Sequence, residues 1–348
     1  MTEPIANVTL DDVSRLGSLG SQRQAMSDVT RGLNHLGTAN ILPMNTDAKG
    51  FIFATRPQMN LSTQNVRAIR RFTMLTTQDR MTLQRAVRVL LDPDLVADNP
   101  KLGTPLVENK LALIPWFTNL LQTLTGWPDE QVDVWTSPAG LEGQQWSMID
   151  STYEINNKFS LNATFQNFSG DPISALFDPW IKIPAAMFKG VMIPRFFSMT
   201  SRRLDYTTRI YRFVTDPTMT YIQKWAATCA SFPIGIDNGR QLDYDVNKLY
   251  QSPGEFSSVQ FECIGARYND PIMLFAFNNA MSMCNDQLKD AVRETNMRKI
   301  ERPIRHLFNY KGYPWINIET MELEWWVPVE VYNAEINRIS ATINGLTK

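Results

Sequence analysis

The segment Glu154-Ile-Asn-Asn-Lys-Phe-Ser-Leu-Asn-Ala-Thr-Phe-Gln166 alternates apolar and polar side chains over most of its length. Alternate residues of an extended chain lie on opposite faces, so this pattern predicts a long strand that is buried on one side. The apolar side holds Ile155, Phe159, Leu161, Ala163 and Phe165, and the polar side holds Asn156, Lys158, Ser160, Asn162, Thr164 and Gln166.

The residues after this strand predict a turn, an apolar anchor and a second strand. Ser169-Gly-Asp-Pro172 contains the residue types that end strands. Ile173 to Trp180 then supplies bulky apolar side chains, and a strand is expected from Leu204 to Val214. Residues 153–214 are therefore expected to form the centre of a sheet that a helix or turn covers on one side.

The composition is that of a globular protein with a substantial core. The chain has 348 residues, of which 43% are apolar and 20% charged, enough for one large or two ordinary domains. A net charge of −1 gives no overall field that would attract nucleic acid.

Cysteine and histidine usage argues against a metal or histidine-centred site. Cys229, Cys263 and Cys284 are widely spaced, which fits buried thiols in a reducing compartment. His35 and His306 have no neighbour at ligand spacing. We expect no metal and no cofactor.

Neither a signal peptide nor a membrane span is expected. The N-terminus lacks a basic start followed by an apolar run. The most apolar window, 111–127, is interrupted by Pro115, Asn119, Gln122 and Gly126. We expect a soluble protein that does not insert into membranes.

The first third of the chain predicts an arm, a strand and several helices. Residues 1–45 are expected to be an extended arm, and Phe51 to Pro57 a short strand. Ser62 is placed to cap a helix from Thr63, and a second helix is expected from Arg80 to Leu91. A helical pair bent at Pro115 is expected over 109–124.

Arginines recur along these helices, and no aromatic residues are interleaved with them as in a nucleic-acid platform. We expect them on solvated faces or in ion pairs with a neighbouring subunit. They are Arg67, Arg70, Arg71, Arg80, Arg85 and Arg88.

Further strands and helices are predicted on both sides of the central strand. The expected strands are 131–136 and 146–153, on the N-terminal side of the central strand, and 258–266, 272–277 and 319–332 beyond it, and the expected helices are 219–230, 287–298 and 334–342. A tight turn at Asn269-Asp-Pro271 would join two of these strands into a hairpin. The order indicates an α+β fold with a mainly antiparallel sheet.

No catalytic motif is present in the sequence, so we expect no enzyme. Two carboxylate pairs could in principle act as acid and base: Glu322 with Glu324, and Asp171 with Asp178. We expect the first pair on a solvated strand face and the second in turns or caps.

The aromatic and methionine content favours an assembly surface. Nine Trp, eighteen Phe, ten Tyr and sixteen Met are present, and several of these residue types are enriched where proteins meet. The predicted subunit-interface residues are Arg195, Arg202, Arg203, Arg209, Arg212 and Trp326.

Three stretches carry a resemblance to a known family. They are Phe51-Ile-Phe-Ala-Thr-Arg-Pro57, Gly170-Asp-Pro-Ile-Ser-Ala-Leu-Phe-Asp-Pro-Trp180 and Arg209-Ile-Tyr-Arg-Phe-Val-Thr-Asp-Pro217. With the element order over residues 50–332, they make the sequence similar to the tail-tube and baseplate tube-initiator proteins of contractile-tailed bacteriophages. Residues 281–315 have no counterpart in that pattern.

The resemblance implies a β-sandwich or barrel with inserted and flanking helices. It implies six copies in a ring, with the edges of the 154–166 strand joined to neighbours around a DNA channel. The polar side of this strand, from Asn156 to Gln166, would line the channel, with the 320–330 face as the alternative.

The implied function is a non-enzymatic part of the virion tail at the junction of baseplate and tail tube. Expected partners are further copies of the chain, tail-tube, baseplate-hub or sheath proteins, and DNA in passage. A neck, tail-terminator or other baseplate component is the alternative, and a carboxylate-dependent cell-wall hydrolase is a distant one. The expected regions are 1–45 (arm), 46–130 (strand and helical insertion), 131–335 (tube-like β domain) and 336–348 (tail).

Overall fold

The computed structural model describes residues 47–130, 132–150, 158–201, 204–242, 256–309 and 311–346. The chain divides into a first unit, Met1–Ala48, and a second, Lys49–Lys348. The fold described below is that of the second unit. The expected arm lies outside the described residues.

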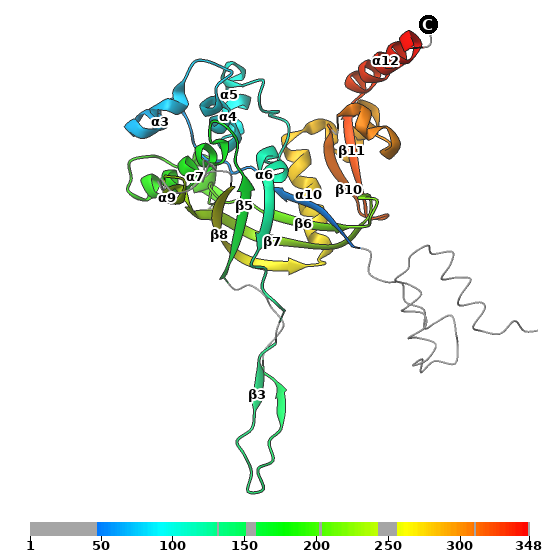
Figure 1. Ribbon diagram of the computed structural model, residues 1–348. Helices are drawn as coiled ribbons and strands as arrows, with labels where there is room; N and C mark the ends of the chain where they lie inside the picture. Colours follow the sequence, from blue (N-terminus) through cyan, green and yellow to red (C-terminus); the bar gives the residue numbers. More distant parts are fainter. Residues whose placement is uncertain are drawn as a thin grey trace, which may run out of the picture. The chain divides into compact units, whose positions relative to one another are not determined.

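A six-stranded sheet forms the centre of this unit, and it curls around its covered face (Figure 1). Its four strand pairs from β6 to β2 are antiparallel, which confirms the α+β class. In spatial order the strands are β1 (Ala48–Ala54), β6 (Ile210–Thr215), β7 (Ile222–Ile236), β8 (Phe256–Tyr268), β5 (Lys158–Gln166) and β2 (Leu121–Thr125).

The central strand is confirmed as β5, from Lys158 onward. Leu161, Ala163 and Phe165 are fully buried, as the alternation predicts, whereas residues 155 and 156 lie outside the described part of the chain. The expectation that neighbouring subunits pair with both of its edges is wrong. β8 occupies one edge along its whole length, and β2 pairs with the other edge over Asn162–Phe165.

Helix α7 (Pro172–Phe188) covers the β5 and β8 end of the sheet. Gly170 and Asp171 have φ values of +90° and +50°, so the chain reverses there, and Pro172 takes the first helical position. Phe177 packs in a cluster of aromatic rings, tilted against Phe165 and edge to face with Phe261. These rings and the buried apolar side chains packed around them are called the first core.

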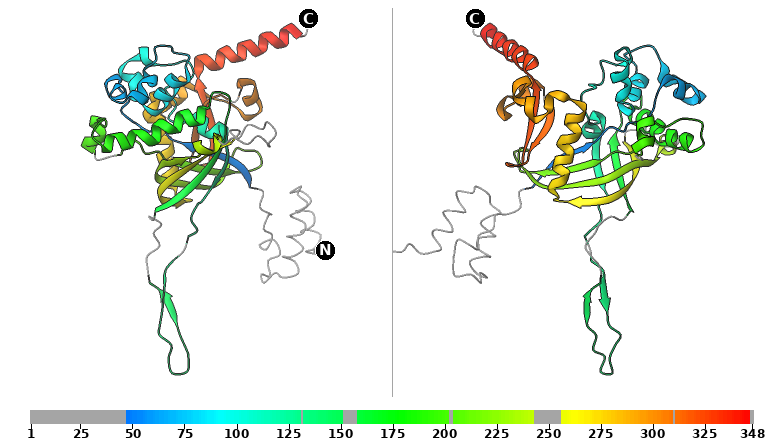
Figure 2. Two further views of the ribbon diagram at one scale, coloured as in Figure 1. Left: turned by 60° about the vertical axis from the view of Figure 1, so that its left-hand side comes forward. Right: turned by 180° about the vertical axis from the view of Figure 1, so that it is seen from behind.

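Helix α10 (Pro271–Cys284) covers the β6 end, on the same face of the sheet as α7 (Figure 2). The strand predicted at 272–277 is wrong, and so is the hairpin. Asp270 accepts a hydrogen bond from the Ile272 amide (2.9 Å), and Pro271 at the next position starts a helix. Phe277 packs on Tyr211 and Phe213 in what is called the second core.

The helix predicted at 219–230 is also wrong, because these residues lead into and form much of strand β7. Asp216 accepts hydrogen bonds from the Thr220 and Tyr221 amides (both 2.9 Å), and Met219 has φ +55°. A tight β6–β7 turn results. Pairing on both sides, with β6 and β8, then outweighs the helix preference of the alanines in this segment. The preceding strand is shorter than expected and begins at Ile210.

The insertion between β1 and β2 contains short helices. Ser62 caps α3 as predicted, accepting a hydrogen bond from the Asn65 amide. The bent helical pair is wrong, because α6 ends at Leu120 and the next five residues form β2 against β5. The elements are α3 (Thr63–Arg67), η2 (Arg70–Thr76), α4 (Leu83–Leu91), α5 (Asp94–Asp98), η3 (Pro100–Leu102) and α6 (Pro115–Leu120).

The C-terminal part adds a three-stranded antiparallel sheet beside α10. The predicted strand is confirmed as the shorter β11, because α12 already starts at Val329, and the predicted C-terminal helix is confirmed within α12. The elements are η4 (Asp286–Leu288), α11 (Asp290–Asn296), β9 (Met297–Lys299), η5 (Arg302–Phe308), β10 (Tyr313–Asn317), β11 (Glu322–Pro328) and α12 (Val329–Leu346).

Two further predicted strands form a separate hairpin, β3 (Val134–Thr136) with β4 (Ser147–Ile149). Within the described residues they pair only with each other (Figure 1). Short helices α8 (Phe196–Ser201) and α9 (Asn238–Gln241) complete the list. No helix in the described ranges is both long and apolar enough to cross a bilayer.

Candidate functional site: the open face of the sheet

The sheet face opposite α7 is polar over the middle of three adjacent strands, and the exposed Phe256 and Ile264 of β8 lie at the two ends of this polar part. Cross-strand partners share a face in an antiparallel pair. Asn162 lies opposite Thr125 on β2 and Gln260 on β8, and Thr164 lies opposite Thr123 and Ser258. The predicted polar side of β5 thus continues over both neighbouring strands.

Charge on this part of the face is sparse and balanced. The Lys158 ammonium lies 2.7 Å from a carboxylate oxygen of Glu262. Ser160 lies opposite Glu262, and Gln166 accepts a hydrogen bond from the Gln122 side-chain amide (3.3 Å). The remaining polar groups are uncharged hydroxyls and amides.

The predicted lumen residues that the structure describes lie on this open face. Lys158 and Asn162 are exposed, and Ser160, Thr164 and Gln166 are half-buried. Asn156 lies outside the described residues. The structure contributes the β2 and β8 residues, which the sequence analysis did not assign to the face. Register cannot be read from one strand alone.

The predicted interface arginines that are described bond within their own chain. Arg195 forms ion pairs with Asp92 and, at 3.1 Å, with Asp94. Arg209 donates to the Cys229 carbonyl (3.2 Å), and Arg212 to the Phe213 carbonyl (2.6 Å). Arg202 and Arg203 lie outside the described residues. Trp326, also predicted at the interface, is 8% exposed.

The carboxylate pair on β11 is not solvated, contrary to expectation. Lys299 of β9 lies between Glu322 (2.8 Å) and Glu324 (3.0 Å). Glu324 also accepts a hydrogen bond from the Trp326 indole (2.9 Å) and is almost fully buried. Pairing with β9 places the lysine there, and this contact is not visible in the local alternation.

The expectation of turns or caps holds for Asp171, which precedes α7, but is wrong for Asp178, which lies within that helix. Asp171 precedes α7 and accepts a hydrogen bond from the Asn167 side chain (2.7 Å). Asp178 forms an ion pair with Lys182 one turn later. The two acids therefore have separate local partners.

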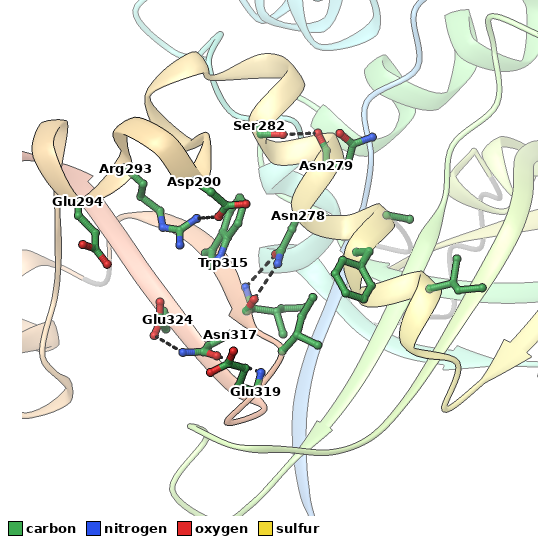
Figure 3. Close-up of a pocket in the computed structure, with 15 residues that line it drawn as sticks. Asn278, Asn279, Ser282, Asp290, Arg293, Glu294, Trp315, Asn317, Glu319 and Glu324 are labelled. Atoms are coloured by element: carbon green, nitrogen blue, oxygen red, sulfur yellow. Dashed lines mark hydrogen bonds and ion pairs between the residues drawn. The ribbon is translucent and has the colours of Figure 1, made fainter.

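A hollow of about 820 Å³ lies between α10, α11, β10 and β11 (Figure 3). Asn278 closes its floor by bonding both the carbonyl (2.7 Å) and the amide (2.9 Å) of Ile316. Arg293 lies 4.2 Å above the Trp315 ring and forms an ion pair with Asp290 (2.7 Å).

The wall of this hollow carries four acidic side chains and one basic one, and neither histidine nor cysteine. The acidic residues are Asp290, Glu294, Glu319 and Glu324, and the basic residue is Arg293. The hollow was not predicted from the sequence, because residues 281–315 have no counterpart in the family pattern. The Asp270-Pro271 helix start is the signal that could have revealed it. In the described chain, no group of three or more His, Cys, Asp or Glu could hold a metal ion.

Two arginines of the helical insertion are buried, so the expectation of solvated faces is wrong for them. Arg88 is 1% exposed and donates to the Leu61 carbonyl (2.9 and 2.7 Å) and the Thr63 hydroxyl (3.0 Å). Arg85 is 4% exposed and donates to two backbone carbonyls. Burial lowers the pKa of Arg88 to about 10. These guanidinium groups hold loops together.

Burial also acts on Asp92, the partner of Arg195. Its carboxylate accepts hydrogen bonds from the amides of Leu61 (2.8 Å) and Leu95 (3.1 Å). Removal from water nevertheless dominates and raises the pKa of Asp92 to about 6, against the opposing effect of Arg195.

The described chain is thus an α+β protein whose curled sheet has one face covered by helices and one polar face open. Its sequence matches the family described as "Putative phage tail tube protein" over residues 4–342. Since this match spans nearly the whole chain, the protein belongs to the phage tail tube family.

Similar solved chains come from contractile injection systems. The tube-terminating cap of the anti-feeding prophage is 11% identical (TM-score 0.27), over 45% of this chain and 82% of that one. The PVC sheath/tube terminator in the extended state is 13% identical (0.28; 45% and 87%). The PVC sheath–tube complex contains a chain that is 14% identical (0.27; 45% and 82%). No curated protein matches the sequence.

Proposed function

We propose that this chain is a non-enzymatic structural subunit of a contractile phage tail. In this proposal six copies form a ring in the virion at the junction of baseplate and tail tube, and the open sheet face lines the DNA channel. Neighbouring tube, baseplate-hub or sheath proteins are its partners. Residues 1–45 act as an assembly arm, 46–130 as an insertion, 131–335 as the tube domain, and 336–348 as a tail.

One observation carries the proposal: the two faces of the curled sheet are chemically opposite. Leu161, Phe165 and Phe261 are fully buried under α7, whereas Asn162 and Gln260 on the other face are exposed. If copies of this chain enclose DNA, this face provides a broad surface for the channel wall that no helix of the described residues covers.

The charge of the part of that face formed by β2, β5 and β8 suits passage rather than retention of DNA. Affinity for duplex DNA rises with the number of phosphates that Lys and Arg neutralise, because each contact releases counterions. On β2 and β5 the only charged side chain is Lys158, and Glu262 of β8 pairs with it. Such a face would touch DNA without holding it.

The sheet edges support assembly into a ring. Within the described residues, β1 and β2 are the edge strands of the six-stranded sheet, and the end of β1 is bonded on its outer side only by the 112–114 segment, where the Ile114 amide donates to the Ala54 carbonyl (2.9 Å). Strands added across subunits would satisfy the remaining outer backbone groups, which is how closed assemblies remove exposed edges. Arg202, Arg203, Arg209 and Arg212 remain proposed interface residues.

Cryo-EM of particles that contain the chain tests the proposal. We expect a six-fold ring next to the baseplate with β5 and β8 facing the lumen. A map with this face on the outside of the ring would contradict the lumen assignment. A map with the chain at the neck or tail terminus would contradict the proposed position.

A solution experiment tests the lumen assignment separately. The double variant Asn162→Lys/Gln260→Lys should bind duplex DNA more tightly once assembled, with a salt slope steeper by up to about 0.9 per added phosphate contact. The matched double variant Glu294→Lys/Glu319→Lys, in the hollow beside α10, should leave binding unchanged. Equal effects of the two variants would argue against a lumen role for the sheet face.

A further inference from the structure

The β3–β4 hairpin carries large exposed apolar side chains that no element of the described residues covers. Trp135, Trp146 and Met148 share one of its faces and are 41%, 59% and 48% exposed. The two indole rings touch edge to face, with centroids 5.5 Å apart. An isolated two-stranded hairpin is marginally stable in water, so a second surface is needed to keep this one ordered.

The charge of this hairpin has a single sign. Residues 132–150 contain Asp133, Glu142 and Asp150 and no basic residue. A surface that accepts it should therefore be apolar and bordered by cations.

The segment after α7 has these properties, and it is called the acceptor surface. Five large apolar side chains within twelve residues are strongly exposed: Phe188 (95%), Val191 (47%), Ile193 (62%), Phe196 (81%) and Met199 (57%). Singly exposed apolar residues are ordinary, but a contiguous run of them marks an interaction site.

The backbone of this segment is firmly held. Met192 is buried in the first core. The Asn65 side chain bonds both the carbonyl (2.6 Å) and the amide (3.0 Å) of Ile193, and Arg195 forms ion pairs with Asp92 and Asp94. The exposed side chains therefore project from an ordered frame, which lowers the entropic cost of binding.

Cations border the acceptor surface. Lys189 within it is exposed, and so are Arg67, Arg70 and Arg71, which follow Asn65 in the chain. Residues 55–78 contain no acidic residue. The competing apolar surface, the outer side of α10 with Ile272 and Phe275, adjoins the hollow whose wall carries four carboxylates. That surface would repel the acidic hairpin.

We propose that the β3–β4 hairpin of one copy docks on the acceptor surface of a neighbouring copy. A head-to-tail contact needs two different, complementary patches on the same chain, and a closed ring results when the rotation closes. This chain carries such a pair, opposite in charge and alike in apolar character. The inference rests on the proposed ring. It adds the contact that joins copies within one ring or joins one ring to the next ring.

Charge exchange between two variants of the full chain tests the docking. Variant one carries Glu142→Lys and Asp150→Lys, and variant two carries Arg71→Glu and Lys189→Glu. Each alone should self-associate at least about tenfold more weakly than the wild type, because like charges meet. An equimolar mixture should recover assembly, since each hairpin then meets an acceptor of opposite charge. Sedimentation velocity reports the result.

An equimolar mixture that associates no more strongly than either variant alone would overturn the docking. Circular dichroism confirms folding of both variants, whose substituted side chains are all exposed. Trp135→Ala/Trp146→Ala should weaken association at least about tenfold as well. The control Met283→Ala removes a side chain of similar exposure (67%) from α10 and should leave it unchanged. An equal loss in the control would also count against the proposal.

Cross-linking separates this inference from the proposed function. A photoreactive amino acid at Leu141, at the tip of the hairpin, should cross-link to residues 188–200 of another copy in a mixture of isotope-labelled and unlabelled chains. Rings whose cross-links fall elsewhere would overturn the docking and leave the ring intact. A wild type that never associates would overturn both.

Discussion

The two cores lie on the same face of one sheet but are closed in different ways. α7 closes the first core together with the helical insertion, where the buried Arg88 donates to the Leu61 carbonyl and the Thr63 hydroxyl. α10 closes the second core with the small C-terminal sheet, where Arg293, whose side chain is 15% exposed, lies over the ring of the buried Trp315. The difference lies in how buried charge is held: Arg88 of the insertion donates to loop atoms, whereas the buried Glu324 of the C-terminal sheet pairs with Lys299 of a neighbouring strand.

The largest expected effects come from removing one ring from each core. Phe177→Ala and Phe277→Ala should each lower the free energy of unfolding by about 3–5 kcal/mol, because a cavity replaces a fully buried ring. Urea unfolding followed by tryptophan fluorescence measures this. If the sheet couples the cores, both variants shift one common transition.

If unfolding instead shows two separate transitions and each variant shifts only one of them, the two cores unfold independently. The sheet would then not couple them. The control Phe188→Ala removes a ring that is 95% exposed. It should change the free energy of unfolding by no more than about 0.5 kcal/mol.

The two arginines should differ in weight. Arg88→Met should cost about 2–4 kcal/mol, because it leaves the buried Leu61 carbonyl without donors. Arg293→Met should cost only about 1 kcal/mol, mainly the loss of its contact with Trp315. Chemical denaturation of both variants gives the comparison, and equal losses would contradict it.

The first core should also respond to pH through Asp92. Its folded-state pKa of about 6 lies above the ordinary value of 3.8, so its contribution to stability is fully present below pH 3.8 and is lost as pH rises through 6. Relative to Asp92→Asn, the wild type should lose up to about 3 kcal/mol between pH 4 and pH 7, at about 1.4 kcal/mol per pKa unit.

Urea unfolding at intervals over this pH range measures the difference. Asp94→Asn is the matched control, because Asp94 also contacts Arg195 but is 41% exposed. A wild-type curve parallel to that of Asp92→Asn would refute a titrating Asp92.

The smallest effects are expected at the helix caps. Ser62 caps α3 near the first core and Asp270 caps α10 in the second. Replacement of either by Ala should cost about 1 kcal/mol, since one amide at each helix start loses its acceptor. Ser62→Asp and Asp270→Asn should retain most of the stability in thermal unfolding, and a full loss there would rule out capping as the cause.

Local patterns in the sequence predicted much of the sheet and part of the candidate site. The alternation in Lys158–Gln166 correctly indicated which side chains are buried, and the Ser62 cap was confirmed. The open polar face of β5 followed from the same pattern. Its continuation onto β2 and β8 could not, because register depends on pairing partners.

What the sequence determined by itself is the α+β class, the polarity of β5 and the Ser62 cap, all of which depend on neighbours in the chain. Only the tertiary structure decided that residues 222–236 are a strand and 271–284 a helix. It also decided that Arg88 is buried and that Lys299 lies between two glutamates. The physical reason is that pairing and burial depend on segments distant in the chain. Their energies outweigh local propensities, which differ by only about a few tenths of a kcal/mol per residue.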